Sequence, residues 1–513
     1  MAILIYPWIS QLLPLITLLV LVLAIPLHFL LHKQSKTQQL SLPPGPPKLP
    51  IIGNMHQLIG HLRHRSLSDL SLIHGPLMLL HLGRAPLLVV SSIEAAREIL
   101  KTQDLNFCTR PNFLTLKRLS YNFLDVAFAP HSEYWREMRK MFVQELMSAK
   151  RVHSFWPVRA GEVANMVDSI SKYCSSSRPV DLTEELLSMA TRMIFRIAFG
   201  KSYEGGAFDS GKFTEVVDEA IVMLGSFSAS DFYPSSSITW VVDIITGLRR
   251  RLESCFRGFD KFYQDIIDDH LERADKGVEE QDIIDVLIGI MRDQSSSIRI
   301  TVNHIKALLM NIFLAGVAST AVIVVWAMSE FARKPELMKK AQDEIRTSVG
   351  KKGKVEESDL EQLHYLKMVL KETLRLHPPG PLLGARECMN QCKVNGYDIS
   401  PGTRVMVNVW AIGRNPKYWN NPDQFCPERF EDSSIDYKGQ HFELLPFGSG
   451  RRICPGMTMG MLNVELALAN LLYCFDWELP GGMNAEDIEM DEGFGLALHK
   501  KSPLLLVPLK FNW

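Results

Sequence analysis

Cysteine is scarce in this sequence, and neither sign of charge is in excess. Its 8 cysteines among 513 residues are too few for the disulfide framework of a small secreted protein. The 56 lysine and arginine residues nearly balance the 57 aspartate and glutamate residues, which leaves a formal net charge of -1. Proteins that bind nucleic acid usually carry a strong basic excess, so we expect no nucleic-acid partner.

Charged residues are absent from the first part of the chain. Between Ala2 and His32 there is no lysine, arginine, aspartate or glutamate. About 20 apolar residues at ~1.5 Å each are enough to cross the ~30 Å hydrocarbon layer of a membrane. A cleaved signal peptide is the alternative, but neither a basic stretch before the apolar run nor a small-residue cleavage site is evident. We therefore expect a single-pass membrane anchor over residues 1–32.

Residues 33–50 are basic and rich in proline. Lys33, Lys36 and Lys48 follow the apolar run, so the positive-inside rule places the rest of the chain in the cytosol. Five prolines lie between Pro43 and Pro50, and residues with a fixed φ and no N–H exclude a helix or a sheet interior. We interpret the segment as a stiff, extended hinge in front of one domain over residues 51–513.

Hydrophobic periodicity predicts that this domain is mainly α with small β-sheets. No internal repeat is evident, and the strand-like runs are short, at Leu77–Leu82, Pro86–Val90, Cys392–Ile399 and Arg404–Val409. Amphipathic helices are expected at Glu133–Leu146, Val180–Phe199, Phe213–Leu224, Ile244–Ala274 and Gln281–Arg292. A further helix at about Ile300–Arg333 is apolar around nearly its whole circumference, which is typical of a buried central helix.

The segment Pro446–Gly456 carries the clearest chemistry. It ends just before an apolar helix predicted at Met457–Cys474, so Cys454 lies where backbone N–H groups and the helix dipole lower the pKa of a thiol. A thiolate is a good ligand for iron. The segment matches Phe-x-x-Gly-x-Arg-x-Cys-x-Gly at every defined position, which disfavours the alternative of an inert buried cysteine. The defined positions are Phe447, Gly450, Arg452, Cys454 and Gly456.

These residues resemble the haem-binding motif of the cytochrome P450 family, and the chain is similar to plant microsomal members of the large group that oxidises specialised metabolites. The resemblance implies haem b with Cys454 as the metal ligand, while Gly450 and Gly456 allow a close approach of the macrocycle and Arg452 pairs with an anionic group on it. It also implies electrons from NADPH-cytochrome P450 reductase, O2 as a substrate, and insertion of one oxygen atom into a small lipophilic molecule. The expected location is the endoplasmic reticulum membrane, with the single large haem-binding domain facing the cytosol.

Further motifs fit the same family. Glu372 and Arg375 are one helical turn apart and, with Arg429 in Pro427–Phe430, resemble the structural Glu-Arg-Arg lock of the family. Buried charges of this kind must be paired with one another.

Three other residues resemble partners of the haem propionates. Trp135 and Arg139 are one helical turn apart, and Arg386 follows Gly384-Ala385; cations and an indole N–H suit carboxylates. A solvated surface position is the alternative for each charge. A basic docking face for an acidic reductase is a further hypothesis, with the residues Arg136, Lys140 and Arg451.

The oxygen-activation motif departs from the family pattern Ala/Gly-Gly-x-Asp/Glu-Thr. Aligned on Gly316, Ala318 takes the position of the acid and Ser319 that of the threonine. Thr320 is one residue late, which rotates it by about 100° on a helix. Three readings stay open: an oxygenase in which Ser319 and water deliver protons, a non-oxygenating isomerase, rearrangement enzyme or dehydratase, and neutral drift around a wet pocket.

Apolar residues at the family's substrate positions predict a pocket for a hydrophobic molecule such as a terpenoid, an alkaloid or a phenolic. Core packing is the alternative for each of them. A non-catalytic haem protein is a hypothesis from another class, but no second signalling or redox domain accompanies the motif. The predicted pocket residues are Phe123, Phe313, Val317, Leu382, Leu383, Phe494 and Leu496.

Overall fold

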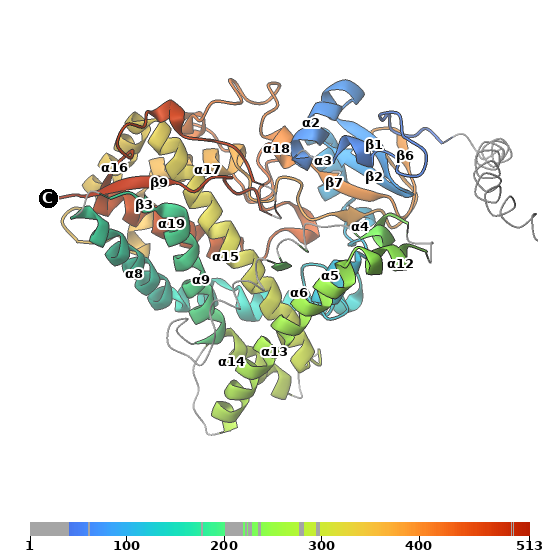
Figure 1. The fold of residues 1–513 in the computed structure, drawn as a ribbon, viewed down its shortest axis with the longest axis horizontal. Helices are drawn as coiled ribbons and strands as arrows, with labels where there is room; N and C mark the ends of the chain where they lie inside the picture. Colours follow the sequence, from blue (N-terminus) through green and yellow to red (C-terminus); the bar gives the residue numbers. More distant parts are fainter. Residues whose placement is uncertain are drawn as a thin grey trace, which may run out of the picture.

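Helix α15 (Val302–Arg333) runs through the middle of the molecule, and most other helices pack around it (Figure 1). The computed structural model describes residues 40–59, 62–175, 178–200, 219–220, 223, 228–233, 238–275, 282–293, 298–493, 495 and 497–512. The predicted anchor at residues 1–32 and most of the predicted helix at Phe213–Leu224 lie outside these residues.

The fold is mainly helical. Helices α15 and α19 are long and apolar enough to cross a membrane, but 67% and 72% of their apolar windows are buried inside the protein, so core packing accounts for their composition. The other helices are α2 (Arg63–His74), α3 (Ile93–Arg97), α4 (Asp104–Phe107), α5 (Leu114–Leu119), α6 (Glu133–Met141), α7 (Ala149–Ser154), α8 (Trp156–Cys174), α9 (Leu182–Phe199), α11 (Ala229–Phe232), α12 (Ile238–Ile245), α13 (Leu248–Asp275), α14 (Ile283–Arg292), α16 (Pro335–Val349), α17 (His364–Leu376), α18 (Val409–Ile412) and α19 (Met457–Cys474).

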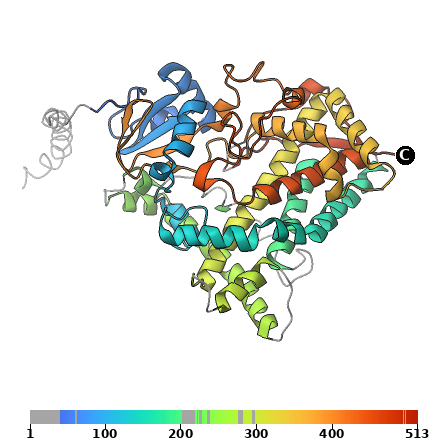
Figure 2. The same ribbon diagram turned by 180° about the vertical axis from the view of Figure 1, so that it is seen from behind.

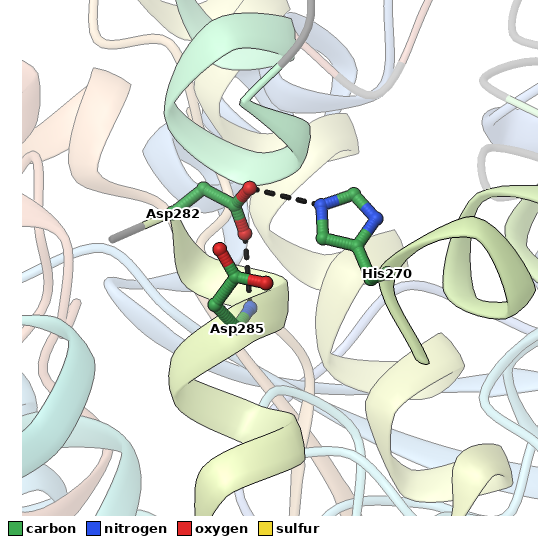
Figure 3. Close-up of side chains that lie close together, drawn as sticks. All are labelled: His270, Asp282 and Asp285. Atoms are coloured by element: carbon green, nitrogen blue, oxygen red, sulfur yellow. Dashed lines mark hydrogen bonds and ion pairs between the residues drawn. The ribbon is translucent and has the colours of Figure 1, made fainter. Parts of the chain in front are cut away.

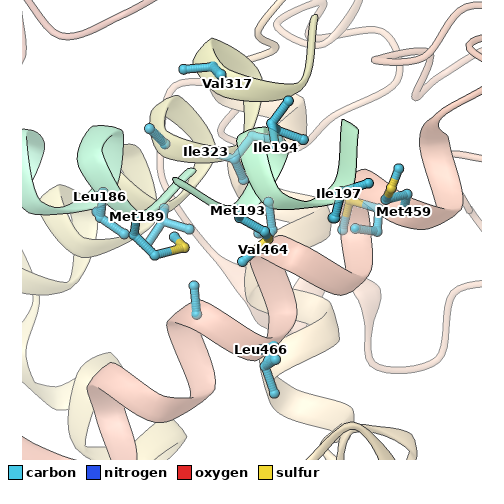
Figure 4. Close-up of a cluster of buried hydrophobic side chains, with 14 of the residues drawn as sticks. Leu186, Met189, Met193, Ile194, Ile197, Val317, Ile323, Met459, Val464 and Leu466 are labelled. Carbon is cyan, nitrogen blue, oxygen red and sulfur yellow. The ribbon is translucent and has the colours of Figure 1, made fainter. Parts of the chain in front are cut away.

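The core forms where α9, α15 and α19 meet (Figure 4). Gly316 of α15 allows the close approach of α9, because a Cβ there would lie 2.7 Å from Ile194 Cδ1. Burial of such aliphatic and methionine side chains is the main favourable term in folding. The labelled members of the cluster are Leu186, Met189, Met193, Ile194, Ile197, Val317, Ile323, Met459, Val464 and Leu466.

Small sheets complete the fold. The largest has the order β1-β2-β7-β4, with β2 and β7 parallel and the other pairs antiparallel, and it lies at one end of the molecule beside α2 and α3 in both views (Figure 1 and Figure 2). The second sheet is β3-β9-β8 and the third is β5-β6. The strands are β1 (Leu77–Leu82), β2 (Ala85–Val90), β3 (Val180–Asp181), β4 (Arg386–Glu387), β5 (Cys392–Val394), β6 (Tyr397–Ile399), β7 (Arg404–Val407), β8 (Phe475–Glu478) and β9 (Leu505–Lys510).

Most predicted elements are confirmed, and the differences have local causes. The predicted helix over 244–274 is wrong at its start, because Gly247 at φ +75 separates α12 from α13. The predicted strand over 392–399 is a hairpin, since Asn395 and Gly396 both adopt positive φ between its two halves. The predicted helix over 133–146 ends in a π-helical turn at Phe142–Leu146.

The described part of the predicted hinge is docked on the domain. Pro44 accepts a hydrogen bond from Leu79 N of β1 at 2.8 Å, and the Asn54 side chain donates to the carbonyls of Pro46 and Pro47. A Cβ on Gly45 would lie 2.1 Å from Leu79 O. Residues 43–47 are thus extended and held against the edge of the sheet at β1, in keeping with a stiff connector.

Candidate active site

Cys454 lies in a tight loop that leads into α19. Its backbone N–H donates to Phe447 O at 3.0 Å, which closes the loop. Gly450 has φ +71, and a Cβ there would lie 2.3 Å from Leu100 O, so this glycine is required by the protein's own packing. Among the described residues, and apart from its own chain neighbours, nothing lies within 4 Å of a Cβ placed on Gly456, which leaves this side of the loop open, as a close approach of a cofactor requires.

The electrostatics of Cys454 differ from the expectation drawn from its position before a helix. Burial raises the pKa of the Cys454 thiol, while the Gly456 N–H and the charge of Arg139 act in the opposite direction. The prediction of a net lowered pKa is thus wrong for the polypeptide by itself, because desolvation of the thiolate outweighs the helix start. A cation bound at the sulfur reverses this balance.

Four arginines converge beside this loop, and we call Arg110, Arg139, Arg386 and Arg452 the arginine cluster. The Arg452 side chain donates to Cys108 O at 2.7 Å and to Ala129 O at 2.6 Å. Arg139 donates to Ile453 O, next to Cys454. Arg110 donates to Ala127 O at 3.0 Å and to the carbonyls of Gly384 and Ala385.

Arg386 is the member of the cluster with a carboxylate partner. It donates to Asp104 Oδ1 at 2.9 Å and to Ser449 O at 2.8 Å. Asp104 is 3% exposed and also accepts from the side chain of Arg451 at 3.0 Å. One buried carboxylate therefore joins Arg451 of the Cys454 loop to Arg386 of β4.

Trp135 packs against the arginine cluster through its indole ring. Its indole N–H donates to Val126 O at 2.9 Å, and its ring lies under the Arg452 guanidinium, 3.7 Å from the ring centroid. This stacking helps to orient Arg452, and the donation of Trp135 to a propionate stays a prediction.

The arginine cluster has more buried positive charge than its own carboxylates balance. The pKa of Arg452 is lowered to about 8, first by burial and then by the charge of Arg110, and burial followed by the charge of Arg386 lowers that of Arg110 to about 9. A large group that carries two carboxylates would offset this desolvation and repulsion. The donor set therefore fits a haem with its propionates at these arginines and its iron at Cys454.

Two members of this site were not predicted. Arg110 precedes Pro111 in a segment that showed no periodic pattern, and Asp104 lies 282 residues from Arg386, its partner. A buried position for either residue has no local signal in the sequence.

Helix α15 presents small residues along one accessible face at its midpoint. Ala315 is exposed, and Gly316, Ala318 and Ser319 are half-buried, within a helix that is otherwise largely buried. The Ser319 hydroxyl donates to Ala315 O at 2.7 Å. Thr320 is 2% exposed and donates to Gly316 O at 3.1 Å, so the rotation expected between Ser319 and Thr320 is present.

The predicted structural lock is assembled. The Glu372 carboxylate forms ion pairs with Arg375 Nε at 2.7 Å and with Arg429 Nε at 2.9 Å. Both Glu372 and Arg375 are essentially fully buried. Arg375 also donates to the carbonyls of Gly413 and Pro422, both at 2.6 Å. The three charges thus join α17 to the segment at 413–429.

The predicted pocket residues are distributed over several elements. Phe313 is 1% exposed and packs its ring edge-to-face on Phe195 at 5.7 Å, so core packing describes it, as it does the buried Val317. Phe123 is half-buried at φ +65. Leu382 and Leu383 pack against two satellite clusters near the sheet. Phe494 and Leu496 lie outside the described residues.

A second polar cluster joins α13 to the start of α14 (Figure 3). The ring of His270 donates from Nδ1 to Ile266 O at 2.7 Å and contacts Asp282 Oδ2 through Nε2 at 2.9 Å. Asp285 lies close enough that the three side chains have metal-like spacing. Because both ring nitrogens are already engaged, we interpret the cluster as a buried hydrogen-bonded histidine–aspartate pair with Asp285 beside it.

The fold and the site define a protein that holds a large anionic prosthetic group against a cysteine ligand. The family model for Cytochrome P450 matches residues 43–507. The chain is 48% identical to Cytochrome P450 71B34 of Arabidopsis thaliana, over 94% of this chain and 95% of the relative. It is 49% identical to Cytochrome P450 71B9 of the same plant, over 91% and 93%.

Solved structures agree with this assignment. A zebra fish cytochrome P450 with abiraterone superposes with a TM-score of 0.72 at 25% identity, over 88% of this chain and 100% of that chain. A zebra fish cytochrome P450 with progesterone gives a TM-score of 0.74 at 24% identity over the same shares, which bears on the fold alone. The chain belongs to the cytochrome P450 family, and it is a haem-thiolate monooxygenase.

Proposed function

We propose that this cytochrome P450 inserts one oxygen atom from O2 into a lipophilic plant specialised metabolite, such as a terpenoid, an alkaloid or a phenolic. The observation that supports it most is the arginine cluster beside the Cys454 loop, whose buried charge suits the propionates of haem b. When bound, that cofactor supplies the activation of oxygen. The chain's own residues hold the cofactor, exclude water and move protons.

The predicted cofactor residues would share the work of holding haem. Cys454 would hold the iron, Phe447 and Gly450 shape the loop around Cys454, and Gly456 leaves one side of the loop open. Arg139, Arg386 and Arg452 would pair with the propionates, with Trp135 stacked on Arg452. Arg110 joins them, because its charge lies close enough to Arg452 to lower the pKa of that guanidinium.

Ser319 is the proposed proton-delivering residue. It lies on the accessible face of α15, and rotation of its hydroxyl away from Ala315 O lets it order a water and pass a proton at Oγ. Thr320 is buried, and its hydroxyl donates to Gly316 O within the same helix, so we assign it a packing role. Ala318 supplies no carboxylate, and water takes the place of the acid of the family pattern.

The proposed partners follow from exposed charge and from the N-terminal sequence. Arg136 is 60% exposed on its side chain and Arg451 is 49% exposed, and Lys140 is exposed as well. These cations suit an acidic NADPH-cytochrome P450 reductase. Residues 1–32 would anchor the protein in the endoplasmic reticulum membrane.

A non-oxygenating P450 is the second candidate function. The observation that favours it is Ala318, because general-acid help is typically worth about 10²–10⁴-fold and no carboxylate stands at this position. Such an enzyme would isomerise, rearrange or dehydrate its substrate.

An oxygen-labelling experiment separates these two functions. Microsomes that contain this protein and a plant reductase are incubated with pooled lipophilic metabolites under ¹⁸O2, with and without NADPH. We expect a product that carries one labelled oxygen and forms only with NADPH. An unlabelled product of unchanged or dehydrated mass would instead establish the second function.

A further inference from the structure

Five consecutive residues connect α15 to the arginine cluster, and we call Asp125–Ala129 the bridge segment. Three of its backbone carbonyls accept from the cluster: Ala127 O accepts from Arg110 at 3.0 Å, and Ala129 O and Val126 O accept from Arg452 at 2.6 Å and 3.4 Å. Val126 O accepts from the Trp135 indole at 2.9 Å. Two of the four arginines that would hold the haem propionates, Arg110 and Arg452, are therefore held by this one stretch of backbone.

The opposite side of the bridge segment is held by one side chain of α15. Asn311 Oδ1 accepts from Val126 N at 3.2 Å and from Ala127 N at 3.1 Å, and Asn311 Nδ2 donates to Asp125 Oδ2 at 2.9 Å. The same Asp125 oxygen accepts from Phe128 N at 3.0 Å. Asp125 is 0% exposed, so water does not replace these hydrogen bonds when one is lost.

The bridge segment needs such support because the turn before it is strained. Tyr121, Asn122 and Phe123 all have positive φ, at 53°, 65° and 65°, and none is a glycine. A left-handed backbone costs such residues roughly 1–2 kcal/mol each. A conformation of this kind persists only where surrounding contacts hold it.

Asn311 also shares a face with the proposed catalytic residue. Ala315, Ala318 and Ser319 follow it by four, seven and eight positions, which places all of them on one side of an α-helix. A displacement of Asn311 would thus move Val126 and Ala127, whose N–H groups donate to its side chain, and with them the arginines bonded to the bridge segment. A displacement of the arginine cluster would move Asn311 through the same hydrogen bonds.

We propose that Asn311 and Asp125 are positioning residues, which fix the arginine cluster relative to the accessible face of α15 through the bridge segment. This inference rests on the proposed haem site. It assigns a function to the buried Asp125 and the half-buried Asn311, which are hydrogen-bonded to each other at 2.9 Å.

The test compares two asparagines of the full-length protein that each tie a helix to a distant segment. Asn311→Ala removes the hydrogen bonds to the bridge segment. Asn470→Ala is the matched control, since Asn470 is 4% exposed and ties α19 to Val355 through hydrogen bonds of 3.1 Å, away from the cluster. For both variants we would measure the thermal midpoint, the carbon monoxide difference spectrum of the reduced protein, and the rate of haem transfer to excess apomyoglobin.

We expect both variants to unfold at lower temperature, while Asn311→Ala alone loses haem about tenfold faster, the lower end of the effect of removing an outer-shell partner. Asp125→Asn keeps an oxygen acceptor for Asn311 and Phe128, so its rate of haem loss should stay within about threefold of the wild-type rate. Asp125→Ala should lose haem as fast as Asn311→Ala.

Two results would overturn the positioning role. One is equal acceleration of haem loss by Asn311→Ala and Asn470→Ala, which would make the effect one of general stability. The other is an unchanged rate in both Asn311→Ala and Asp125→Ala. A wild-type protein without the carbon monoxide spectrum of a thiolate-bound haem would refute the proposed haem site as well, and the two failures are therefore distinguishable.

Discussion

At the scale of the residue, the difference between Ser319 and Thr320 decides how the altered motif works. Ser319 lies on the accessible face of α15 and Thr320 is 2% exposed, although their hydroxyls make the same kind of bond to the carbonyl one turn earlier. We predict that Ser319→Ala lowers NADPH-dependent turnover by about 100-fold, the lower end of the range for lost general-acid help. Product formation and substrate binding would be measured side by side.

The matched control is Thr320→Ala on the adjacent position. It removes a buried hydroxyl that bonds within the helix, so its turnover should stay within about threefold, with a loss of stability of about 1 kcal/mol. Equal losses of turnover in the two variants would show that Ser319 has no special part in proton delivery.

The same residue-scale view explains which parts of the site could be predicted. Cys454 and the ends of α19 follow from neighbouring residues, because a helix start and its glycines are local features. Asp104 and Asn311 could not be found in this way, since the partners of Asn311 lie 184 to 186 residues away. The sign of the Cys454 pKa shift was missed for a similar reason: burial by distant segments outweighs the local helix start.

At the scale of the element, the Glu372 lock joins α17 to the segment that precedes the Cys454 loop. Glu372→Gln would leave the guanidinium groups of Arg375 and Arg429 buried without a carboxylate. Breaking a buried pair in this way typically costs about 3–5 kcal/mol. We predict that the variant accumulates poorly and unfolds at lower denaturant concentration, measured by chemical denaturation. The exposed Glu361 provides the control Glu361→Gln, which should behave as wild type.

The polar cluster of His270, Asp282 and Asp285 between α13 and α14 makes the stability of the fold depend on pH. Burial, and then the charge of Asp282, raise the pKa of Asp285 to about 6, above its value of 3.8 in an unfolded chain. Folding therefore favours the protonated carboxyl, and stability that is present at low pH is lost as the pH rises through 6. Asp285→Asn should remove this loss and stabilise the protein at pH 8. A shift of two pKa units corresponds to ~2.7 kcal/mol. Because the side chain is partly exposed and solvent screens its charge, we expect a gain of about 1 kcal/mol.

Denaturation at pH 4.5 and pH 8 would measure this effect. The difference between Asp285→Asn and wild type should shrink at the lower pH, where both side chains are neutral. Asp268→Asn on the exposed side of α13 should show no such pH dependence. A stabilisation of equal size at both values would contradict the assignment to Asp285.

At the scale of the whole molecule, exposed apolar side chains gather near the sheet. Trp240 and Ile245 of α12 are 53% and 79% exposed, and Ile51 is 75% exposed. The two segments lie near each other, because the Tyr233 hydroxyl, shortly before α12, donates to Ile51 O at 2.6 Å. An apolar patch that includes Ile51, which follows the predicted anchor closely in the sequence, suits the surface of a membrane. The periodicity of α12 alone does not reveal this patch.

This patch leads to a prediction about membrane attachment. A protein without residues 1–32 keeps the docked segment at Pro43–Pro47, so we expect it to fold, to bind haem and still to sediment in part with phospholipid vesicles. Trp240→Ser with Ile245→Ser in that shortened protein should weaken vesicle binding by more than about tenfold, because each large apolar side chain contributes about 1.5–3 kcal/mol on burial. Leu187→Ser with Leu505→Ser, at exposed positions of α9 and β9, is the control and should leave binding unchanged. If the two double variants bind vesicles equally, the patch does not face the membrane, and the anchor alone attaches the protein.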